Sequence, residues 1–596
     1  MKSTWSIGAE QAPLYGMGCC VMLVASRPGA AMNRLYFGDN LQVLREHIAD
    51  ASVDLIYLDP PFNSKRDYNL LFKTPKGHDS DAQITAFEDS WHWGEQAERE
   101  FNEILHQPNT AVAELLRALR SFLGENDMMA YVVMMANRLL ELHRVLKPTG
   151  SLYLHCDPTA SHYLKLVLDG VFGKANFRSE ISWKRSSAHN DAKQGRMQYG
   201  NIRDVIFFYT KSDDWQWNWI YSPYSTEYVD GFYTHIEECT GRRYRLDNLT
   251  AAKPGGDVSY EFHGTKPYKG RYWAYSREKL EKFKAEGRLY FPKNGGTPAY
   301  KRYLDEMPGV PLQNDWADIK PTPSGEYLGY QTQKPLALLE RIIQASSNPG
   351  DVVLDPFCGC GTAVDAAQKL GRRWIGIDIT HLAIALIEKR LKDRYPYLNR
   401  SKPDKAAAVA SGVAETVPDY MQTFEVLGTP EDLGGARDLS LRDKYQFQWW
   451  ACSLVNAQPY QGKKKGADGG IDGLIFFQDD KGAAKKIVVS VKGGDNVNVA
   501  MVRDLAHVVA REKAEIGLFV TLADPSRPMS TEAVKEGFYA SPTTGAEFPR
   551  IQILTIAGLL DGSERVRSPD LSGVHTFKKA KIEQGVDPRR GDLFGG

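Results

Sequence analysis

Residues 53–62 read VDLIYLDPPF, an apolar run that ends in an aspartate, two prolines and a phenylalanine. The run is short and rich in branched and aromatic residues, which predicts a buried strand. Two successive prolines have no N–H to donate, so they end the strand and leave carbonyls free at its carboxyl end. Open α/β sheets bind their ligands at that end. We therefore expect a ligand site at residues 59–62.

The end of this stretch forms a receptor for a flat ring that carries an amino group, from Asp59, Pro60, Pro61 and Phe62. The Asp59 carboxylate and the Pro60 carbonyl can accept both amino hydrogens, and Phe62 can stack on the ring face. Holding the hydrogens in this way exposes the nitrogen lone pair to an electrophile. The alternative interpretation is a strand followed by a proline-rich turn.

A second stretch, GDVVLDPFCGCGT at residues 350–362, predicts a strand that runs into a Gly-x-Gly turn. A helix is expected from about Ala363 to Leu370, and a further strand at residues 374–377 ends on Asp378. An acid at this place in a βαβ unit is the arrangement that holds an adenosine ribose by its hydroxyls. The glycines let the backbone approach a ligand closely. The third glycine of a dinucleotide fingerprint is not at its expected spacing.

Together the two stretches resemble the motifs of DNA amino-methyltransferases, which use S-adenosylmethionine to methylate the exocyclic nitrogen of adenine or cytosine. The motif order resembles the β group of that family, seen in type III modification subunits, and the resemblance covers roughly residues 33–396. It implies a Rossmann-like α/β sheet in permuted motif order, S-adenosylmethionine as cofactor and double-stranded DNA as substrate. Asp59 to Phe62 would then hold a flipped base. Aspartate at position 59 favours adenine N6, with cytosine N4 as the alternative.

The same resemblance assigns further residues to the cofactor pocket. Lys334 stands before an amphipathic helix, in a segment that resembles the one covering the methionine end of the cofactor. Asp39 and Asp157 each precede a predicted helix, so each has the alternative role of capping it. The full set of expected cofactor-binding residues is Asp39, Asp157, Lys334, Asp355, Phe357, Gly359, Gly361, Thr362 and Asp378.

The region between the two motifs is crowded with aromatic and basic residues, as in WQWNW at 215–219 and KGRYW at 269–273. Such interleaving suits contact with DNA grooves and phosphates, and the resembling family places target recognition here. The alternative is a β-rich insertion with an aromatic core. Lys65 and Arg66, just after the catalytic strand, are candidates for phosphate contacts or simply surface cations.

A second α/β domain is expected after a linker. Its stretches GADGGIDGLIF at 466–476 and IVVSVK at 487–492 resemble the Mrr-like branch of the PD-(D/E)xK nucleases. The resemblance implies Asp472 as a Mg²⁺ ligand and Lys492 as the catalytic lysine. Ser490 stands where the family carries Glu, Asp or Gln, and serine is a weaker ligand. Two readings stay open: a domain that cleaves DNA, or a nuclease-like fold that binds DNA or a separate restriction–helicase subunit. Asp468 is a candidate second carboxylate.

Composition sets the remaining expectations. The chain has 596 residues, 42% hydrophobic and 25% charged, which is ordinary for a globular protein of several domains. Its net charge is +0, so any DNA-binding surface must be local. There is no apolar run of eighteen residues and hence no expected membrane contact. Seven cysteines without paired spacing suggest reduced thiols in a cytoplasmic protein.

The expected organisation follows from these motifs. The sequence leaves the oligomeric state open, and a homodimer is one alternative, because dimers are common in the resembling group. The segments are a loose tail at 1–32, the first methyltransferase half at 33–189, target recognition at 190–330, the second half at 331–400, a linker at 401–430, the nuclease-like domain at 431–565 and a tail at 566–596.

Overall fold

A computed structural model of the chain describes residues 33–61, 67–73, 79–88, 91–187, 197, 199–252, 260–330, 332–399, 418–460, 469–479, 484–569 and 581. Several residues singled out in the sequence lie outside this set: the expected tail at 1–32, Phe62, Lys65, Arg66 and Asp468. No helix within the described ranges is long and apolar enough to cross a membrane.

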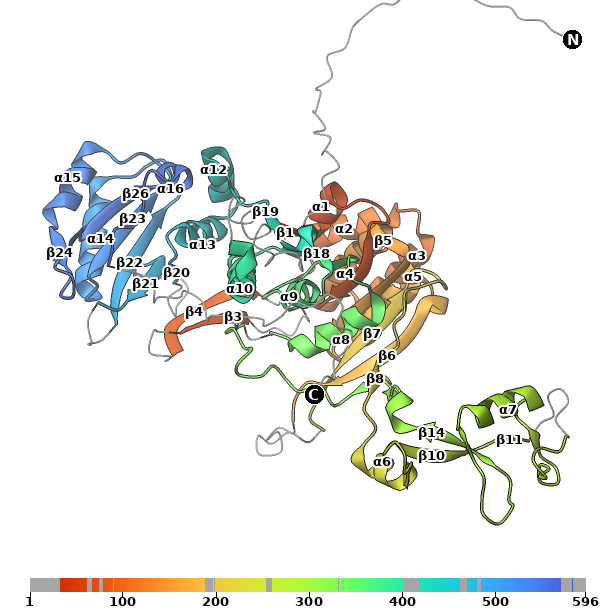
Figure 1. Cartoon of the computed structure of the whole chain (residues 1–596). Helices are drawn as coiled ribbons and strands as arrows, with labels where there is room; N and C mark the ends of the chain where they lie inside the picture. Colours follow the sequence, from red (N-terminus) through yellow and green to blue (C-terminus); the bar gives the residue numbers. More distant parts are fainter. Residues whose placement is uncertain are drawn as a thin grey trace, which may run out of the picture.

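The centre of the molecule is a nine-stranded sheet in the order β16-β6-β7-β5-β2-β17-β18-β1-β19 (Figure 1). Its strands pair in parallel except around β7, which is antiparallel to both neighbours. The bounds are β1 Asn33–Phe37, β2 Val53–Leu58, β5 Leu146–Cys156, β6 Phe177–Lys184, β7 Arg203–Thr210, β16 Asp315–Trp316, β17 Val352–Asp355, β18 Arg373–Asp378 and β19 Phe424–Leu427.

Helices cover both faces of this sheet, as expected for parallel strands buried on two sides. One face packs against α1 Asn40–His47, α2 Glu95–Leu105, α3 Thr110–Leu123, α4 Asp127–Val145 and α5 Ser161–Phe172. The other packs against α8 Leu336–Ser346, α9 Thr362–Lys369 and α10 His381–Arg394. The doubly wound α/β class predicted from the sequence is confirmed. So is the permuted order, since β2 and β17 are neighbours in the sheet although 293 residues separate Leu58 from Val352 in the chain.

Three strands of this sheet fall where the sequence predicted other roles, and one of them is the short β16, which lies within the stretch expected to be target recognition and pairs with β6. β7 belongs to the central sheet although it lies within the stretch expected to be target recognition, because its alternate residues Ile206 and Phe208 are buried in the core. β19 lies within the expected linker and pairs with β1. β19 has only four residues, and their side chains are only partly buried, so its sequence shows no clear strand pattern.

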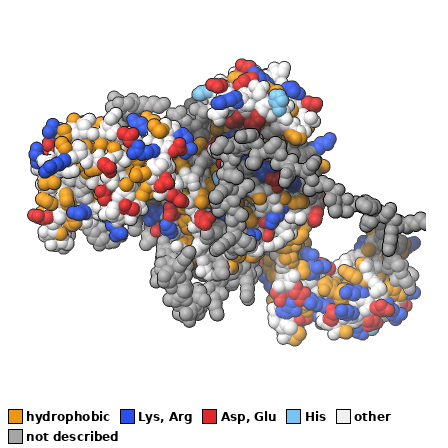
Figure 2. All heavy atoms as spheres, turned by 90° about the horizontal axis from the view of Figure 1, so that it is seen from above, with side chains coloured by type: hydrophobic (Ala, Val, Ile, Leu, Met, Phe, Trp, Pro, Cys, Tyr) orange, Lys and Arg blue, Asp and Glu red, His pale blue; other side chains and the backbone are white. Residues whose placement is uncertain are grey.

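The described residues of 221–311 form a lobe beside the central sheet, which we call the insertion lobe (Figure 1). Its small core contains Trp273, Phe262 and Leu280. Acidic and basic side chains are interspersed on its visible face (Figure 2). Its elements are β8 Tyr221–Ser222, α6 Thr226–Phe232, β9 His235–Ile236, β10 Arg243–Asn248, β11 Thr250–Ala251, β12 Tyr272–Trp273, α7 Arg277–Ala285, β13 Leu289–Tyr290, β14 Ala299–Tyr303 and β15 Val310–Pro311.

A hairpin of β3 Asp67–Lys73 and β4 Asp79–Glu88 follows β2 in the chain.

The C-terminal domain is built on a five-stranded sheet in the order β20-β21-β22-β23-β26. Its elements are α12 Leu433–Arg442, α13 Lys444–Leu454, β20 Gln458–Pro459, β21 Gly473–Phe477, β22 Lys485–Lys492, α14 Val499–Arg511, β23 Ile516–Thr521, α15 Arg527–Lys535, β24 Phe538–Ala540, β25 Glu547–Pro549, β26 Ile551–Thr555 and α16 Ile556–Asp561.

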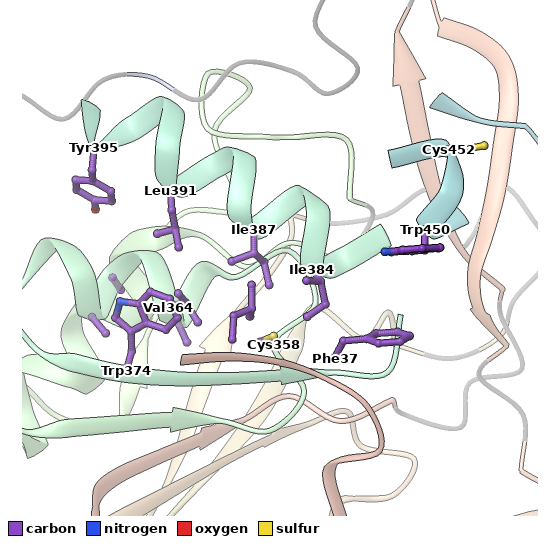
Figure 3. Packing of buried hydrophobic residues seen from close by; sticks show 14 of the residues in the cluster. Phe37, Cys358, Val364, Trp374, Ile384, Ile387, Leu391, Tyr395, Trp450 and Cys452 are labelled. Atoms are coloured by element: carbon purple, nitrogen blue, oxygen red, sulfur yellow. The ribbon is translucent and has the colours of Figure 1, made fainter. Parts of the chain in front are cut away.

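The two domains share a hydrophobic cluster. Trp450 of α13 lies at the end of α10, close to Ile384 and Phe37 (Figure 3). Next to it on α13, Trp449 packs in a second cluster with Leu382 and Leu386 of α10. The C-terminal domain is therefore docked onto the central domain by buried aromatic side chains as well as by the chain connection.

A buried ion pair holds α9 against α10. The Arg390 guanidinium binds the Asp365 carboxylate with N–O distances of 2.7 and 2.9 Å, and the exposed fractions of the two side chains are 2% and 0%. Arg390 also donates to the carbonyl of Cys360, 3.0 Å away, in the glycine-rich loop. One side chain therefore joins the loop, α9 and α10.

We expect Arg390→Met to lower the free energy of unfolding by about 3–5 kcal/mol, because it leaves a buried carboxylate short of its main partner. Urea unfolding monitored by tryptophan fluorescence measures the change. The matched control is Lys389→Met, which removes the partly exposed i,i+4 pair with Asp393 on the same helix and should cost no more than about 0.5 kcal/mol. Equal losses in the two variants would contradict the assignment.

Candidate active site

The two motifs meet because their strands pair. β17 lies parallel to β2, with Val353 opposite Leu55 and Leu354 opposite Ile56. Asp54 fixes this register, since its carboxylate accepts a hydrogen bond from the Val352 N–H at 2.9 Å and binds Lys147 at 2.7 Å. Parallel strands end at one edge of a sheet, so Asp59 and the glycine-rich loop face the same cavity.

The cavity is open to solvent, and its volume counted out into that solvent is about 1090 Å³. It is lined by the carboxyl groups of Asp39, Asp59, Asp355 and Asp378 and by two cations, Arg138 and Lys334. Of the residues predicted for the site, ten line the cavity: Asp39, Asp59, Pro60, Pro61, Lys334, Asp355, Phe357, Gly359, Thr362 and Asp378.

The two carboxylate oxygens of Asp59 differ in their contacts. Oδ2 is paired with the Lys334 ammonium, which enters from the segment before α8. Oδ1 is buried and accepts no hydrogen bond from any residue that the structure describes. A buried carboxylate oxygen without a donor is costly unless a partner binds. The geometry therefore suits a ligand N–H at Oδ1, while Lys334 holds the other oxygen in place.

Backbone N–H groups and Asp378 shape the glycine-rich loop. The Asp378 carboxylate accepts from the Gly359 N–H at 2.9 Å and from the N–H and hydroxyl of Thr380 at 2.8 and 2.7 Å. Burial raises the pKa of Asp378, and these hydrogen bonds oppose that rise. Burial also raises the pKa of Asp355 well above its usual value. The loop therefore presents its backbone to the cavity with Asp378 at its edge.

The opposite rim of the cavity comes from the β1–α1 turn. Asp39 caps α1 through the N–H of Leu41 at 2.9 Å and binds Arg138 at 2.9 Å through its second oxygen. Arg138 also donates to Asn40, whose amide donates to the carbonyl of Pro356 at 2.8 Å. Both roles considered for Asp39 therefore occur together: it caps the helix and lines the cavity.

Two predicted residues do not line the cavity. Asp157 accepts from the N–H and the hydroxyl of Thr159 in a local turn, both at 3.0 Å. It does not cap α5, whose N-cap residue is Ala160. Gly361 lies behind the loop, where it begins α9. The sequence reasoning missed Asn40, Arg138 and Tyr57, which all line the cavity. A signal for Arg138 was available, because it is a cation that closely follows the apolar run 128–136 in helix α4.

The expected nuclease residues also come together. Asp472 Oδ2 accepts from the Val491 N–H at 2.7 Å and lies 3.4 Å from the Ser490 hydroxyl. Asp472 Oδ1 accepts from the Gln448 amide of α13 at 3.0 Å. Lys492 ends the same strand, β22, as Ser490. Gln448 is the member that sequence reasoning missed.

This donor set does not fit Mg²⁺. The described residues contain no group of three His, Cys, Asp or Glu side chains that could hold a metal ion. Among the residues that the structure describes, Asp472 is the one carboxylate at this point, and N–H donors already bind both of its oxygens. An amide and a hydroxyl add no negative charge to offset that of a divalent cation.

Two family models match the chain, one in each of its two domains. A family model described as DNA methylase matches residues 53–389, more than half of the chain. A family model described as restriction endonuclease matches residues 441–538.

Several curated proteins are similar to the chain. The type II methyltransferase M.EcaI of Enterobacter cloacae is 32% identical over 266 residues, 44% of this chain and 57% of that protein. The type III enzyme StyLTI Mod subunit of Salmonella typhimurium is 30% identical over 357 residues, 57% of this chain and 50% of that protein. The DNA adenine methyltransferase YhdJ of Escherichia coli is 25% identical over 367 residues, 61% of this chain and 85% of that protein. The chain thus spans only about half the length of the first two.

Gly361 gives a test of how tightly the loop is packed. Its φ is +73°, and an added Cβ would lie 2.7 Å from Cγ1 of Ile387. Gly124 has the same φ of +73° but open space around it. We expect Gly124→Ala to cost about 1–2 kcal/mol of stability for the left-handed backbone alone. Gly361→Ala should cost about 1–3 kcal/mol more, because the methyl group overpacks the loop against α10.

Urea unfolding of the two alanine variants measures the difference. Equal midpoints would mean that Ile387 moves aside without cost and that the loop is not held against α10.

Proposed function

We propose that this chain, which belongs to the DNA methylase family, transfers a methyl group from S-adenosylmethionine to the N6 amine of adenine in double-stranded DNA. The observation that carries the proposal is Asp59, whose buried Oδ1 has no donor among the described residues. It faces a cavity whose other wall is the glycine-rich loop. An amine acceptor and a cofactor loop therefore meet in one pocket.

Residues that line the cavity could hold S-adenosylmethionine. The cofactor supplies an electrophilic methyl group on a positively charged sulfur. Asp378 would bind the ribose hydroxyls, as acids at the end of this strand do in nucleotide-binding βαβ units, and the backbone at Gly359 and Thr362 would lie against the rest of the cofactor.

The residues around Asp59 would act by orientation more than by acid–base chemistry. Asp59 Oδ1 and the Pro60 carbonyl accept the two hydrogens of the amine, which turns its lone pair toward the methyl group. Lys334 pairs with Oδ2 and keeps the carboxylate from rotating. An aromatic amine is a weak nucleophile because its lone pair is shared with the ring, and this arrangement returns part of the lone pair to nitrogen.

Adenine rather than cytosine is supported by two observations. Position 59 carries aspartate, which favours adenine N6 by resemblance to the family. YhdJ, similar to this chain over 61% of its length, is described as a DNA adenine methyltransferase. Cytosine N4 is the competing product, and analysis of methylated nucleosides separates the two.

We propose that the insertion lobe contacts DNA. The target base must be flipped out of the duplex to reach the cavity. Residues 221–310 carry 15 Lys and Arg against 12 Asp and Glu, whereas the whole chain balances 74 against 74. Some lobe aromatics are core residues, such as Trp273 with 1% exposure. Others, such as Tyr268 with 64% exposure, are available for a partner.

We propose that the C-terminal domain binds DNA or a partner subunit and does not cleave DNA, since its donor set does not fit Mg²⁺. The StyLTI relative is a modification subunit of a type III enzyme. That likeness supports a restriction–modification setting in the cytoplasm, with a separate restriction subunit as the partner.

Asp59→Ala should lower the rate of methyl transfer by about 10²–10³-fold or more, because the amine loses its oriented acceptor. Transfer of tritiated methyl groups to DNA from a host without DNA methyltransferases measures the rate. Equilibrium dialysis with S-adenosylmethionine should show binding retained. The control is Asp213→Ala, which removes an exposed carboxylate far along the chain from the motif. Full activity in Asp59→Ala would refute the assignment.

Incubation of plasmid DNA with Mg²⁺ tests the C-terminal domain. We expect no cleavage by the wild type or by Lys492→Ala, on methylated or unmethylated DNA, with methyl transfer intact in both. Cleavage by the wild type that disappears in Lys492→Ala would instead establish a fused restriction–modification enzyme.

A further inference from the structure

A buried chain of hydrogen bonds lies beside Asp59 on three neighbouring strands. The Tyr57 hydroxyl on β2 is 3.0 Å from Nδ1 of His155 on β5. Nε2 of His155 is 3.1 Å from Oδ2 of Asp204 on β7. The exposed fractions of the His155 and Asp204 side chains are 0% and 2%. Buried polar chains of this kind are retained where they orient groups.

The chain reaches the catalytic carboxylate. Nδ1 of His155 lies 3.9 Å from Oδ1 of Asp59, the oxygen that has no donor among the described residues. This distance is slightly too long for a hydrogen bond, but catalytic contacts often shorten when the substrate binds. Tyr57 lies on β2 and Asp59 directly follows the end of that strand, and Nδ1 of His155 is near both side chains.

The partners of His155 determine which nitrogen carries its proton. Hydrogen bonding to His155 and the charge of the nearby Arg185 lower the pKa of Asp204 despite its burial, so its carboxylate is an acceptor. Arg185 Nε lies 3.1 Å from Asp204 Oδ1 as an ion pair, out of line for a hydrogen bond. Nε2 of His155 must then be the donor. In the neutral ring Nδ1 is the acceptor, and it faces both Tyr57 and Asp59.

We propose that His155, held by Asp204, is a positioning residue that receives, through Asp59 Oδ1, the proton that the target amine loses. This inference rests on the proposed methyl transfer. In that step the N–C bond forms as the C–S bond breaks, and the electron pair of the broken bond goes to sulfur. One N–H bond of the amine breaks, and its proton passes to Asp59 Oδ1 and then to His155 Nδ1, as the Tyr57 hydroxyl that donates to Nδ1 before the reaction turns away. The resulting imidazolium is paired with the Asp204 carboxylate, and the proton returns to solvent through the pocket when the product leaves.

Asp204→Asn tests the proposal with little change of shape. An asparagine amide can donate to Nε2 and so move the ring proton to Nδ1, where it blocks the acceptor that faces Asp59. We expect the single-turnover rate of methyl transfer to fall by about 10²-fold. The KM for DNA and the affinity for S-adenosylmethionine should stay within about twofold, a split that general destabilisation does not produce.

His155→Gln is the second variant. Its amide can still donate to Asp204, but it offers no basic nitrogen to Asp59, so the same loss of rate is expected with cofactor binding retained. The matched control is Tyr153→Phe, which removes a buried 2.7 Å hydrogen bond to Ser346 from the same strand, outside the cavity. The control should keep the wild-type rate.

The outcomes separate the two hypotheses. If the wild type methylates DNA and both variants match its rate, the inference is wrong and the proposed function stands. If both variants lose cofactor binding or folding together with the rate, the buried chain is only structural and the inference is also wrong. If the wild type transfers no methyl group to DNA, the proposed function fails and the inference falls with it.

Discussion

The parallel pairing of β2 with β17 is the constraint on which the site depends. Neither strand carries a complete pocket: one leads into Asp59 and the two prolines after it, and the other leads into the glycine-rich loop. Parallel neighbours must end at the same edge of a sheet, so pairing alone brings the two ends together. The Asp54 carboxylate adds a side-chain bond to the start of β17 that fixes the register. A slip by one residue would turn Asp59 to the opposite face.

Charged groups at the site are each oriented by a specific partner. Asp39 is bound by Arg138, Asp59 by Lys334, and Asp378 by backbone N–H groups of the loop. Charges in a partly buried cavity are costly unless they are paired or hydrogen-bonded. The partners meet that cost and fix each side chain before a ligand arrives, which is the condition for catalysis by positioning.

Helix α13 connects the two domains through polar as well as apolar contacts. Its Gln446 side chain accepts from the backbone N–H of His381, where α10 begins directly after the turn that contains Thr380. Two residues further on, Gln448 donates to Asp472. The next residue, Trp449, packs against Leu382 and Cys360. The helix therefore touches both the edge of the cavity and Asp472 of the endonuclease-like domain, and the docking of the domains follows from these contacts.

The sequence alone determined the local elements and their chemistry. Short branched runs predicted β2, β17 and β18, and the paired prolines and glycines marked where those strands end. These signals are readable because backbone geometry and burial act on neighbouring residues. Ten of the residues predicted in this way line one cavity, and the pairing of β2 with β17 brings them together there. Tertiary structure alone decided the rest: Arg138 on Asp39, Lys334 on Asp59, Gln448 on Asp472 and the chain from Tyr57 to Asp204 all join residues far apart in sequence. Such partners are chosen by the packing of strands and helices, and a single sequence carries no periodic signal for contacts between distant segments.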